Sequence, residues 1–223
     1  MNLEFSNFST ILFDAAGTLF ELRESVGQGY AKVATEFDLE LCPDLTELAF
    51  RKHFRAMPSP YPSESTDPEQ DWWSELVDRV LMEQQIETPG GFFTALWEHY
   101  AAASTWKLFP EVPEVLSTLQ EKNIQMILVT NFDERIFPIL SGLEVIDYFG
   151  DDVVTSASAR CRKPESAIFQ QAVAKSSNGP ILHVGDERKA DWEGARAAGI
   201  EAFELERPKN CLRDLIRTQQ TEG

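Results

Sequence analysis

Residues 11–20 read ILFDAAGTLF, and this short stretch decides the fold. An apolar run ends at Asp14, and the chain then turns through two alanines, Gly17 and Thr18. Glycine permits a sharp turn, and the hydroxyl of Thr18 can hydrogen-bond back to the carboxylate. The pattern is typical of a nucleophile at the carboxyl end of a buried strand, with a turn-capping aspartate as the alternative. Ala16 occupies the position where a second carboxylate would be a natural acid–base partner.

Strands and helices alternate in two parts of the chain, residues 1–20 and about 107–223. Short apolar runs predict strands over residues 10–13, 125–130, 152–155, 181–184 and 202–205. Amphipathic stretches predict helices over residues 112–122, 134–140, 165–174, 189–198 and 212–219. This alternation indicates an α/β fold: a three-layer, Rossmann-like core with a parallel sheet, whose ligands bind beyond the carboxyl ends of the strands.

Residues 21–106 have a different pattern, with helical periodicity, many aromatic residues and no convincing strand. We expect helices over residues 26–37, 45–55, 71–84 and 91–105. The sequence therefore predicts two domains, an α/β core formed by residues 1–20 and 107–223 and an α-helical domain inserted after the first strand.

Composition excludes several classes of partner. The 223 residues carry a net charge of −17, which disfavours binding to nucleic acid or to an anionic membrane surface. Three widely spaced cysteines without a CxxC motif indicate neither a disulfide framework nor a zinc site. The first ten residues do not have the pattern of a signal peptide, so we expect none, and no apolar run is long enough to span a membrane. We therefore expect a cytoplasmic monomer or small homo-oligomer.

Three further strand ends carry candidate site residues. Thr130 and Asn131 end the second strand, where a hydroxyl and the N–H groups of a following helix could hold a phosphate oxygen; alternatively Asn131 or Asp133 caps that helix. In ARCRKPE, residues 159–165, Lys163 stands beside two arginines, and one buried cation would hold an anion. The alternative is a solvated basic loop.

The last strand end lies in ILHVGDERKADWEGARAAG, residues 181–199. Asp186 ends the strand, and Asp191 follows at the start of a helix rich in small residues. With Asp14 they supply three carboxylates, which are ligands that suit Mg²⁺. His183 lies on the same buried strand, and we expect it to be a core residue.

The ordered set of motifs resembles the haloacid dehalogenase-like (HAD) superfamily. FDAAGTL, Thr130–Asn131, Lys163–Pro164 and GDERKAD are similar to its four motifs, and the helical insert resembles its first type of cap. The stretches WW, WKLFPEV, TNFDER and HVGDERKADWEGARAAGI resemble the rhythmically expressed gene two type subgroup, and this likeness spans almost the whole chain.

The resemblance implies a Mg²⁺-dependent hydrolase acting on a small phosphorylated metabolite. It implies that Asp14 is the nucleophile and a metal ligand, together with the carbonyl of Ala16, Asp186 and Asp191. Thr130 would bind the transferred group with Asn131, and Lys163 would orient and neutralise it.

Ala16 departs from the phosphatase pattern, in which the second aspartate protonates the leaving alcohol and then activates water. Such general acid–base catalysis contributes about 10²–10⁴-fold. One interpretation is a phosphatase of weak or leaving-group-selective activity, with Glu21, Arg23 or Glu187 as the nearest substitutes for the proton donor. A second is a catalytically feeble binding or regulatory protein.

A third interpretation keeps the other reactions of the superfamily. Haloacid dehalogenases also lack the second aspartate, but they need no metal, which Asp186 and Asp191 argue against. Phosphonate hydrolases need a lysine from the cap, where only Lys32 and Lys52 stand.

Overall fold

The computed structural model describes residues 7–216, which form two compact units. Among the described residues, the α/β unit consists of residues 7–21, Leu108–Glu134 and residues 143–216, and the helical unit of Leu22–Lys107 and Arg135–Gly142. Residues 135–142 thus pack with the helical unit, whereas the sequence-based division placed them in the α/β core.

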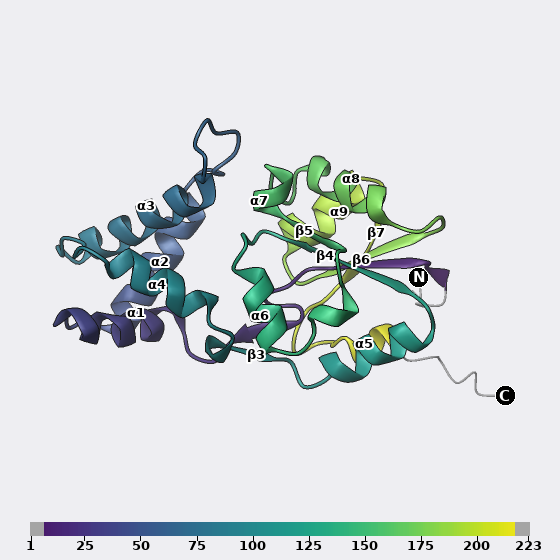
Figure 1. Ribbon diagram of the computed structural model, residues 1–223, viewed down its shortest axis with the longest axis horizontal. Helices are drawn as coiled ribbons and strands as arrows, with labels where there is room; N and C mark the ends of the chain where they lie inside the picture. Colours follow the sequence, from purple (N-terminus) through teal and green to yellow (C-terminus); the bar gives the residue numbers. More distant parts are fainter. Residues whose placement is uncertain (1–6, 217–223) are drawn as a thin grey trace. The chain divides into compact units, whose positions relative to one another are not determined.

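A five-stranded sheet forms the centre of the α/β unit (Figure 1). Its strand order is β5-β4-β1-β6-β7, and every neighbouring pair is parallel. The strands are β1 (Thr10–Phe13), β4 (Gln125–Thr130), β5 (Val153–Thr155), β6 (Ile181–Gly185) and β7 (Glu201–Glu204). The predicted α/β fold with a parallel sheet is confirmed.

Helices cover both faces of this sheet, so its strands are apolar on both sides. On one face, Leu12 and Ile127 pack with Phe169 of α8 (Ser166–Lys175) and with Trp192. On the other face, Phe13 meets Phe149 edge to face, with ring centroids 6.4 Å apart. Figure 1 shows α8 and α9 (Gly194–Ala197) on one side of the sheet and α5 (Val112–Glu121) on the other.

The remaining short helices are α7 (Ser156–Ala159) and α10 (Arg213–Ile216). The predicted helix over residues 212–219 extends beyond the described residues. The predicted helix over residues 189–198 begins instead with a π-helical stretch, Arg188–Glu193, which continues into α9. This wider turn directly follows β6 and carries Asp191.

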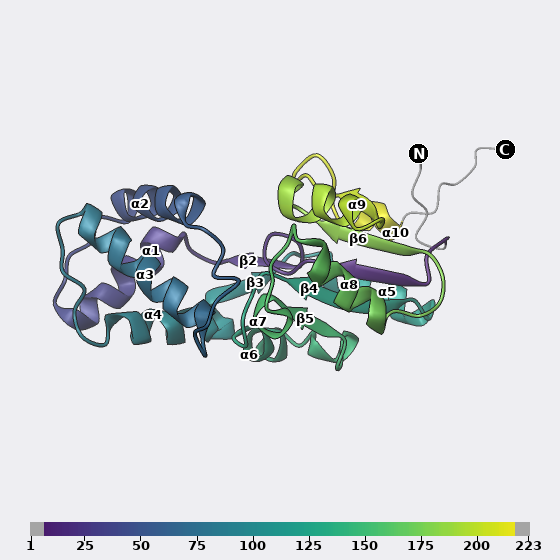
Figure 2. The same ribbon diagram turned by 90° about the horizontal axis from the view of Figure 1, so that it is seen from above.

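Five helices form the helical unit: α1 (Val26–Ala34), α2 (Pro43–Ala56), α3 (Pro68–Glu83), α4 (Phe92–Ala101) and α6 (Ile136–Gly142) (Figure 2). Ser25 caps α1 in a capping box with Gln28, and Asp67 caps α3. An aromatic and aliphatic interior joins the helices and includes Tyr30, Trp72, Leu76, Phe92 and Leu96.

The expectation of no strand over residues 21–106 was wrong at both ends of that region. Phe20–Leu22 (β2) and Trp106–Leu108 (β3) pair in a two-stranded sheet. Each strand has three residues, too few for an alternating pattern to be recognised in the sequence. Among the helices of residues 7–216, none combines the length and apolarity that a membrane crossing needs.

Candidate active site

Asp14 stands at the end of the central strand. Its backbone N–H donates to the carbonyl of Val184 at 2.9 Å, which extends the ladder between β1 and β6 by one residue. The residue is only 8% exposed. The half-buried Ala16 follows in the turn that leaves the strand.

Gly17 and Thr18 bring this turn against Asp186. Gly17 has a φ of +91°, and a Cβ there would lie 2.3 Å from Oδ2 of Asp186. Glycine is therefore required both by the backbone conformation and by the close approach of the carboxylate. The hydroxyl of Thr18 donates to Oδ1 of Asp186 at 3.1 Å, not to Asp14 as the sequence suggested.

The end of β6 places the two other carboxylates. Asp186 directly follows Gly185 and is exposed, whereas Asp191 on the π-helical turn is buried. A Cβ on Gly185 would lie 2.2 Å from Cγ of Asp191, so the glycine lets the carboxylate rest on the strand. Trp192 donates from its indole N–H to the carbonyl of Gly185 at 2.7 Å and fixes the turn.

Lys163 joins two of these carboxylates. Its Nζ lies 2.6 Å from Oδ1 of Asp14 and 2.6 Å from Oδ1 of Asp191, and the residue is 5% exposed. Of the three predicted cations in the loop, Lys163 is the one placed at the strand ends. Arg162 instead donates to the carbonyl of Asn131 at 3.4 Å.

Thr130 and Asn131 end the neighbouring strand β4. Thr130 is 1% exposed. The side-chain amide of Asn131 bonds to the backbone of Lys163 at both ends: Oδ1 accepts from its N–H at 2.8 Å, and Nδ2 donates to its carbonyl at 3.1 Å. Since α6 begins only at Ile136, Asn131 lies outside the first turn of that helix.

Burial and charge oppose one another in this cluster. Burial raises the pKa of Asp14 to about 7, helped by the charges of Asp191 and Asp186 and opposed by Lys163. Burial would also raise the pKa of Asp191, but Lys163 and His183 outweigh it and hold that pKa below its usual range. Burial works to lower the pKa of Lys163, yet the two aspartates keep it above its usual value.

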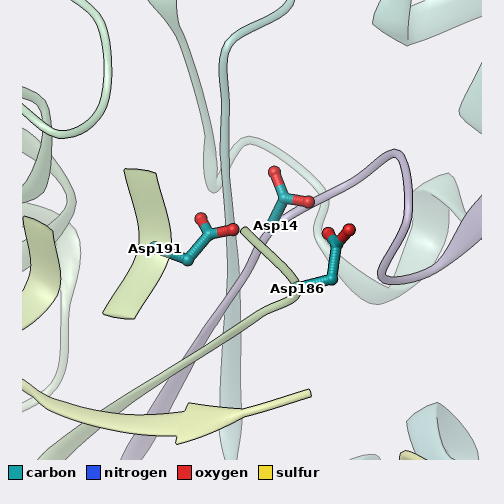
Figure 3. A group of neighbouring side chains, drawn as sticks. All are labelled: Asp14, Asp186 and Asp191. Atoms are coloured by element: carbon teal, nitrogen blue, oxygen red, sulfur yellow. The ribbon is translucent and has the colours of Figure 1, made fainter. Parts of the chain in front are cut away.

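Three carboxylates meet at this point of the α/β unit (Figure 3). One oxygen each from Asp14, Asp186 and Asp191 lies within 4.8 Å of the others. When all three aspartates are ionised, their negative charge exceeds the positive charge of Lys163. Although Asp186 is exposed at the surface, partial loss of water around its carboxylate, together with the charge of Asp191, raises its pKa as well. The donor set is hard oxygen, and a divalent cation would relieve this excess charge. The residues therefore fit a Mg²⁺ site.

Two residues outside the predicted set contact the cluster or the turn beside it. His183 is fully buried, and its Nε2 lies 2.9 Å from Oδ1 of Asp191. Arg207 donates from Nη2 to the carbonyl of Thr18 at 3.1 Å and pairs with the buried Glu111. Alternation along β6 could have indicated the role of His183. Residues 183 and 185 point to the same face of the sheet, and Asp191 rests against Gly185 on that face. No sequence signal links Arg207 to the turn.

Known proteins are similar to this chain in sequence and in fold. A model of the haloacid dehalogenase-like hydrolase family matches residues 8–199. Human haloacid dehalogenase-like hydrolase domain-containing protein 3 is 28% identical over 201 residues, covering 86% of this chain and 80% of the relative. The Drosophila melanogaster rhythmically expressed gene 2 protein is 27% identical over 214 residues, covering 87% and 81%.

Solved structures share the fold. The Bacillus subtilis putative HAD-hydrolase YfnB, whose structure is bound to magnesium, aligns with a TM-score of 0.74 at 17% identity and covers 89% of each chain. A HAD phosphatase from Thermococcus onnurineus aligns with a TM-score of 0.63 at 20% identity, covering 96% of this chain and 90% of the other. The resemblance inferred from the four motifs is confirmed, and the chain belongs to the haloacid dehalogenase-like hydrolase family.

Proposed function

We propose that the protein is a Mg²⁺-dependent phosphatase that cleaves a small phosphorylated metabolite through a phosphorylated Asp14. The observation that carries this proposal is the buried contact of Lys163 with both Asp14 and Asp191 at the strand ends. A nucleophile beside a fixed ammonium group suits the transfer of an anionic phosphoryl group. The phosphatase and magnesium-bound structures of the same fold support it.

In the proposed reaction, an oxygen of Asp14 attacks phosphorus and the bond to the leaving oxygen breaks. Lys163 neutralises charge on the phosphoryl group, and Thr130 offers its hydroxyl to a phosphoryl oxygen. Water then attacks phosphorus, the bond to Asp14 breaks, and inorganic phosphate leaves. Bound at Asp14, Asp186 and Asp191, with the carbonyl of Ala16, Mg²⁺ would offset negative charge on the transferred group.

Ala16 sets the expected substrate preference. A methyl side chain neither protonates the leaving alcohol nor activates water, so alkyl phosphates should react slowly. Aryl and acyl phosphates leave without protonation and should be preferred. We propose that the helical unit acts as a cap that selects the substrate. A cytoplasmic location and a monomeric or small homo-oligomeric state remain predictions of the sequence.

Ala16 also favours a second candidate function. A protein that keeps the nucleophile, the lysine and the carboxylates but lacks the proton donor could bind phosphorylated ligands without turning them over. It would then act as a binding or regulatory protein, and ligand would be recovered intact after incubation.

Substitution at position 16 distinguishes these functions. Rates with an aryl phosphate and an alkyl phosphate are measured with and without Mg²⁺ for the native protein, Ala16→Asp and Ala16→Asn. We expect Mg²⁺-dependent cleavage of the aryl ester by the native protein. Ala16→Asp should raise alkyl-ester cleavage by about 10²–10⁴-fold, because it restores a general acid.

Ala16→Asn is the matched control for Ala16→Asp, since asparagine has nearly the same size as aspartate but has no acidic proton to transfer. An equal gain with asparagine would contradict the proposed role of the proton. No cleavage of either ester by the native protein or by Ala16→Asp would favour the binding function.

A further inference from the structure

His183 is a buried polar residue for which the proposed reaction has no use. It lies on β6, is fully buried, and faces the layer that contains Phe169. Its ring stands edge to face with that phenyl ring, with centroids 5.1 Å apart and an interplanar angle of 87°. A histidine needed only for packing could be replaced by phenylalanine, so the polar contact of the ring requires an explanation.

The contact fixes which ring nitrogen carries hydrogen. Nε2 lies 2.9 Å from Oδ1 of Asp191, whose pKa is held below its usual range, so the carboxylate accepts and Nε2 donates. Nδ1 is buried without a hydrogen-bond partner. An unused acceptor lone pair costs less there than an unused N–H donor, which favours the tautomer protonated at Nε2.

Asp191 accepts hydrogen bonds from three different residues. Oδ1 accepts from His183 on β6 and from Lys163 at 2.6 Å, whereas Oδ2 accepts from the backbone N–H of Glu187 at 3.0 Å. These contacts determine both the position and the rotation of the carboxylate. Lys163 in turn contacts Asp14 at 2.6 Å. The orientation of Asp191 therefore influences the position of the Lys163 ammonium group relative to Asp14.

We infer that His183 is a positioning residue: through its Nε2–H it holds Asp191 in the rotation that aims Lys163 at Asp14. This inference rests on the proposed function, because it assigns His183 a role in phosphoryl transfer at Asp14. His183 touches neither the nucleophile nor the substrate in this role. Its loss should therefore slow turnover and leave substrate affinity nearly unchanged.

Two substitutions separate hydrogen bonding from packing. His183→Phe keeps the ring and its contact with Phe169 but has no donor. His183→Gln places an amide N–H near the position of Nε2 but loses the ring. Steady-state kcat and KM are measured with an aryl phosphate and saturating Mg²⁺, together with the melting temperature of each variant.

We expect His183→Phe to lower kcat by about 10–100-fold with KM within about twofold, as for other supporting hydrogen bonds of a site. His183→Gln should retain most of the native kcat even if it melts at a lower temperature. A phenylalanine variant of native kcat would overturn the inference, as would a glutamine variant as slow as the phenylalanine variant.

Nuclear magnetic resonance of the metal-free native protein, with ¹⁵N-labelled histidine, tests the contact without catalysis. We expect a slowly exchanging ring proton on Nε2 of His183, an unprotonated Nδ1, and a changed proton shift in Asp191→Asn. A His183 ring protonated at Nδ1 alone would overturn the inference, even if the variants failed to fold. If the native protein has no more activity than Asp14→Asn, the proposed function fails, and the spectrum still decides whether His183 holds Asp191.

Discussion

The two units bury charge in different ways. In the α/β unit, Asp14, Lys163 and Asp191 form one connected buried group at the strand ends. In the helical unit, the buried Arg135 lies against tryptophan rings, with its guanidinium carbon 3.6 Å from the ring centroid of Trp97. Of residues 7–216, only Asp14, Asp186 and Asp191 form a group with metal-ligand spacing. The group with metal-ligand spacing therefore lies in the α/β unit, where we propose that the chemistry takes place.

Removing the proposed nucleophile should have the largest effect. Asp14→Asn keeps the size of the side chain and an acceptor for Lys163 but cannot form the phosphorylated intermediate. We expect aryl phosphate turnover to fall by roughly 10³-fold or more, as for other nucleophile substitutions. Asp78→Asn on α3 of the helical unit is the matched control and should keep native kcat. Residual turnover of native size in Asp14→Asn would place the nucleophile elsewhere.

Lysine substitutions in the two units sharpen the comparison. Lys163→Met leaves the carboxylates of Asp14 and Asp191 buried without their cation, so the free energy of unfolding should fall by about 3–5 kcal/mol. Lys52→Met removes an exposed lysine that pairs with Glu83 and should change stability far less. Urea unfolding of both variants gives the two values. Equal losses would mean that the buried ion pairs contribute no more than a surface pair.

Two glycine substitutions compare a close approach with open space. Gly185→Ala would push a methyl group against Asp191, which should cost about 1–3 kcal/mol of stability and lower kcat. Gly90→Ala in the helical unit meets no atom within 4 Å and should be within about 0.5 kcal/mol of the native protein. Thermal unfolding and aryl phosphate turnover check both variants. A neutral Gly185→Ala would show that Asp191 does not need to rest on the strand.

The smallest expected effect concerns the melting temperature of the metal-free protein. Removing the charge of Asp14 and removing the charge of Glu83 should change it in opposite directions. The pKa of Asp14 is about 7 in the fold, above its ordinary value of 3.8, because burial penalises its charge. Its ionisation therefore costs stability increasingly from about pH 4 to pH 7. Asp14→Asn should melt at a higher temperature than the native protein at pH 8, and this gain should disappear below about pH 4.

Glu83 is the opposite case, since hydrogen bonds from Lys52 and His53 lower its pKa. Its ionised form adds stability above its ordinary pKa, and this contribution is lost as the pH falls through the lowered value. Glu83→Gln should therefore melt slightly lower at pH 8 and match the native protein in acid. If the melting temperatures of Asp14→Asn and Glu83→Gln changed in the same direction at pH 8, the expected contrast between these two carboxylates would be wrong.

Much of the fold could be predicted because its signals are local. Apolar runs that end in Asp14, Thr130 and Asp186 mark strand ends, and parallel strands bring such ends to one edge. The three-residue strands β2 and β3 carry too little pattern, and their pairing joins residues far apart in the sequence. The π-helical turn likewise depends on how Asp191 and Trp192 pack on β6, which periodicity does not encode.

The site could be predicted in its residues but not in its connections. Asn131 reads as a phosphate contact or a helix cap, whereas its side chain bonds to the backbone of Lys163. His183 reads as a core residue, and it is buried as expected, but it also contacts Asp191. Such hydrogen bonds depend on angles between loops that are distant in sequence. Local sequence patterns therefore do not reveal these hydrogen bonds, because the residues that they join are far apart in the sequence.

The most direct test of the central claim is a rapid-quench measurement of phosphorylation at Asp14 with an aryl phosphate and Mg²⁺. Because Ala16 cannot activate water, the second step should be slow. We expect a burst of about one phenol per protein molecule and a phosphoryl group on the peptide containing Asp14, both absent in Asp14→Asn. Turnover without a burst would leave the slow second step unsupported. A phosphoryl group on another residue, or turnover retained in Asp14→Asn, would contradict the account.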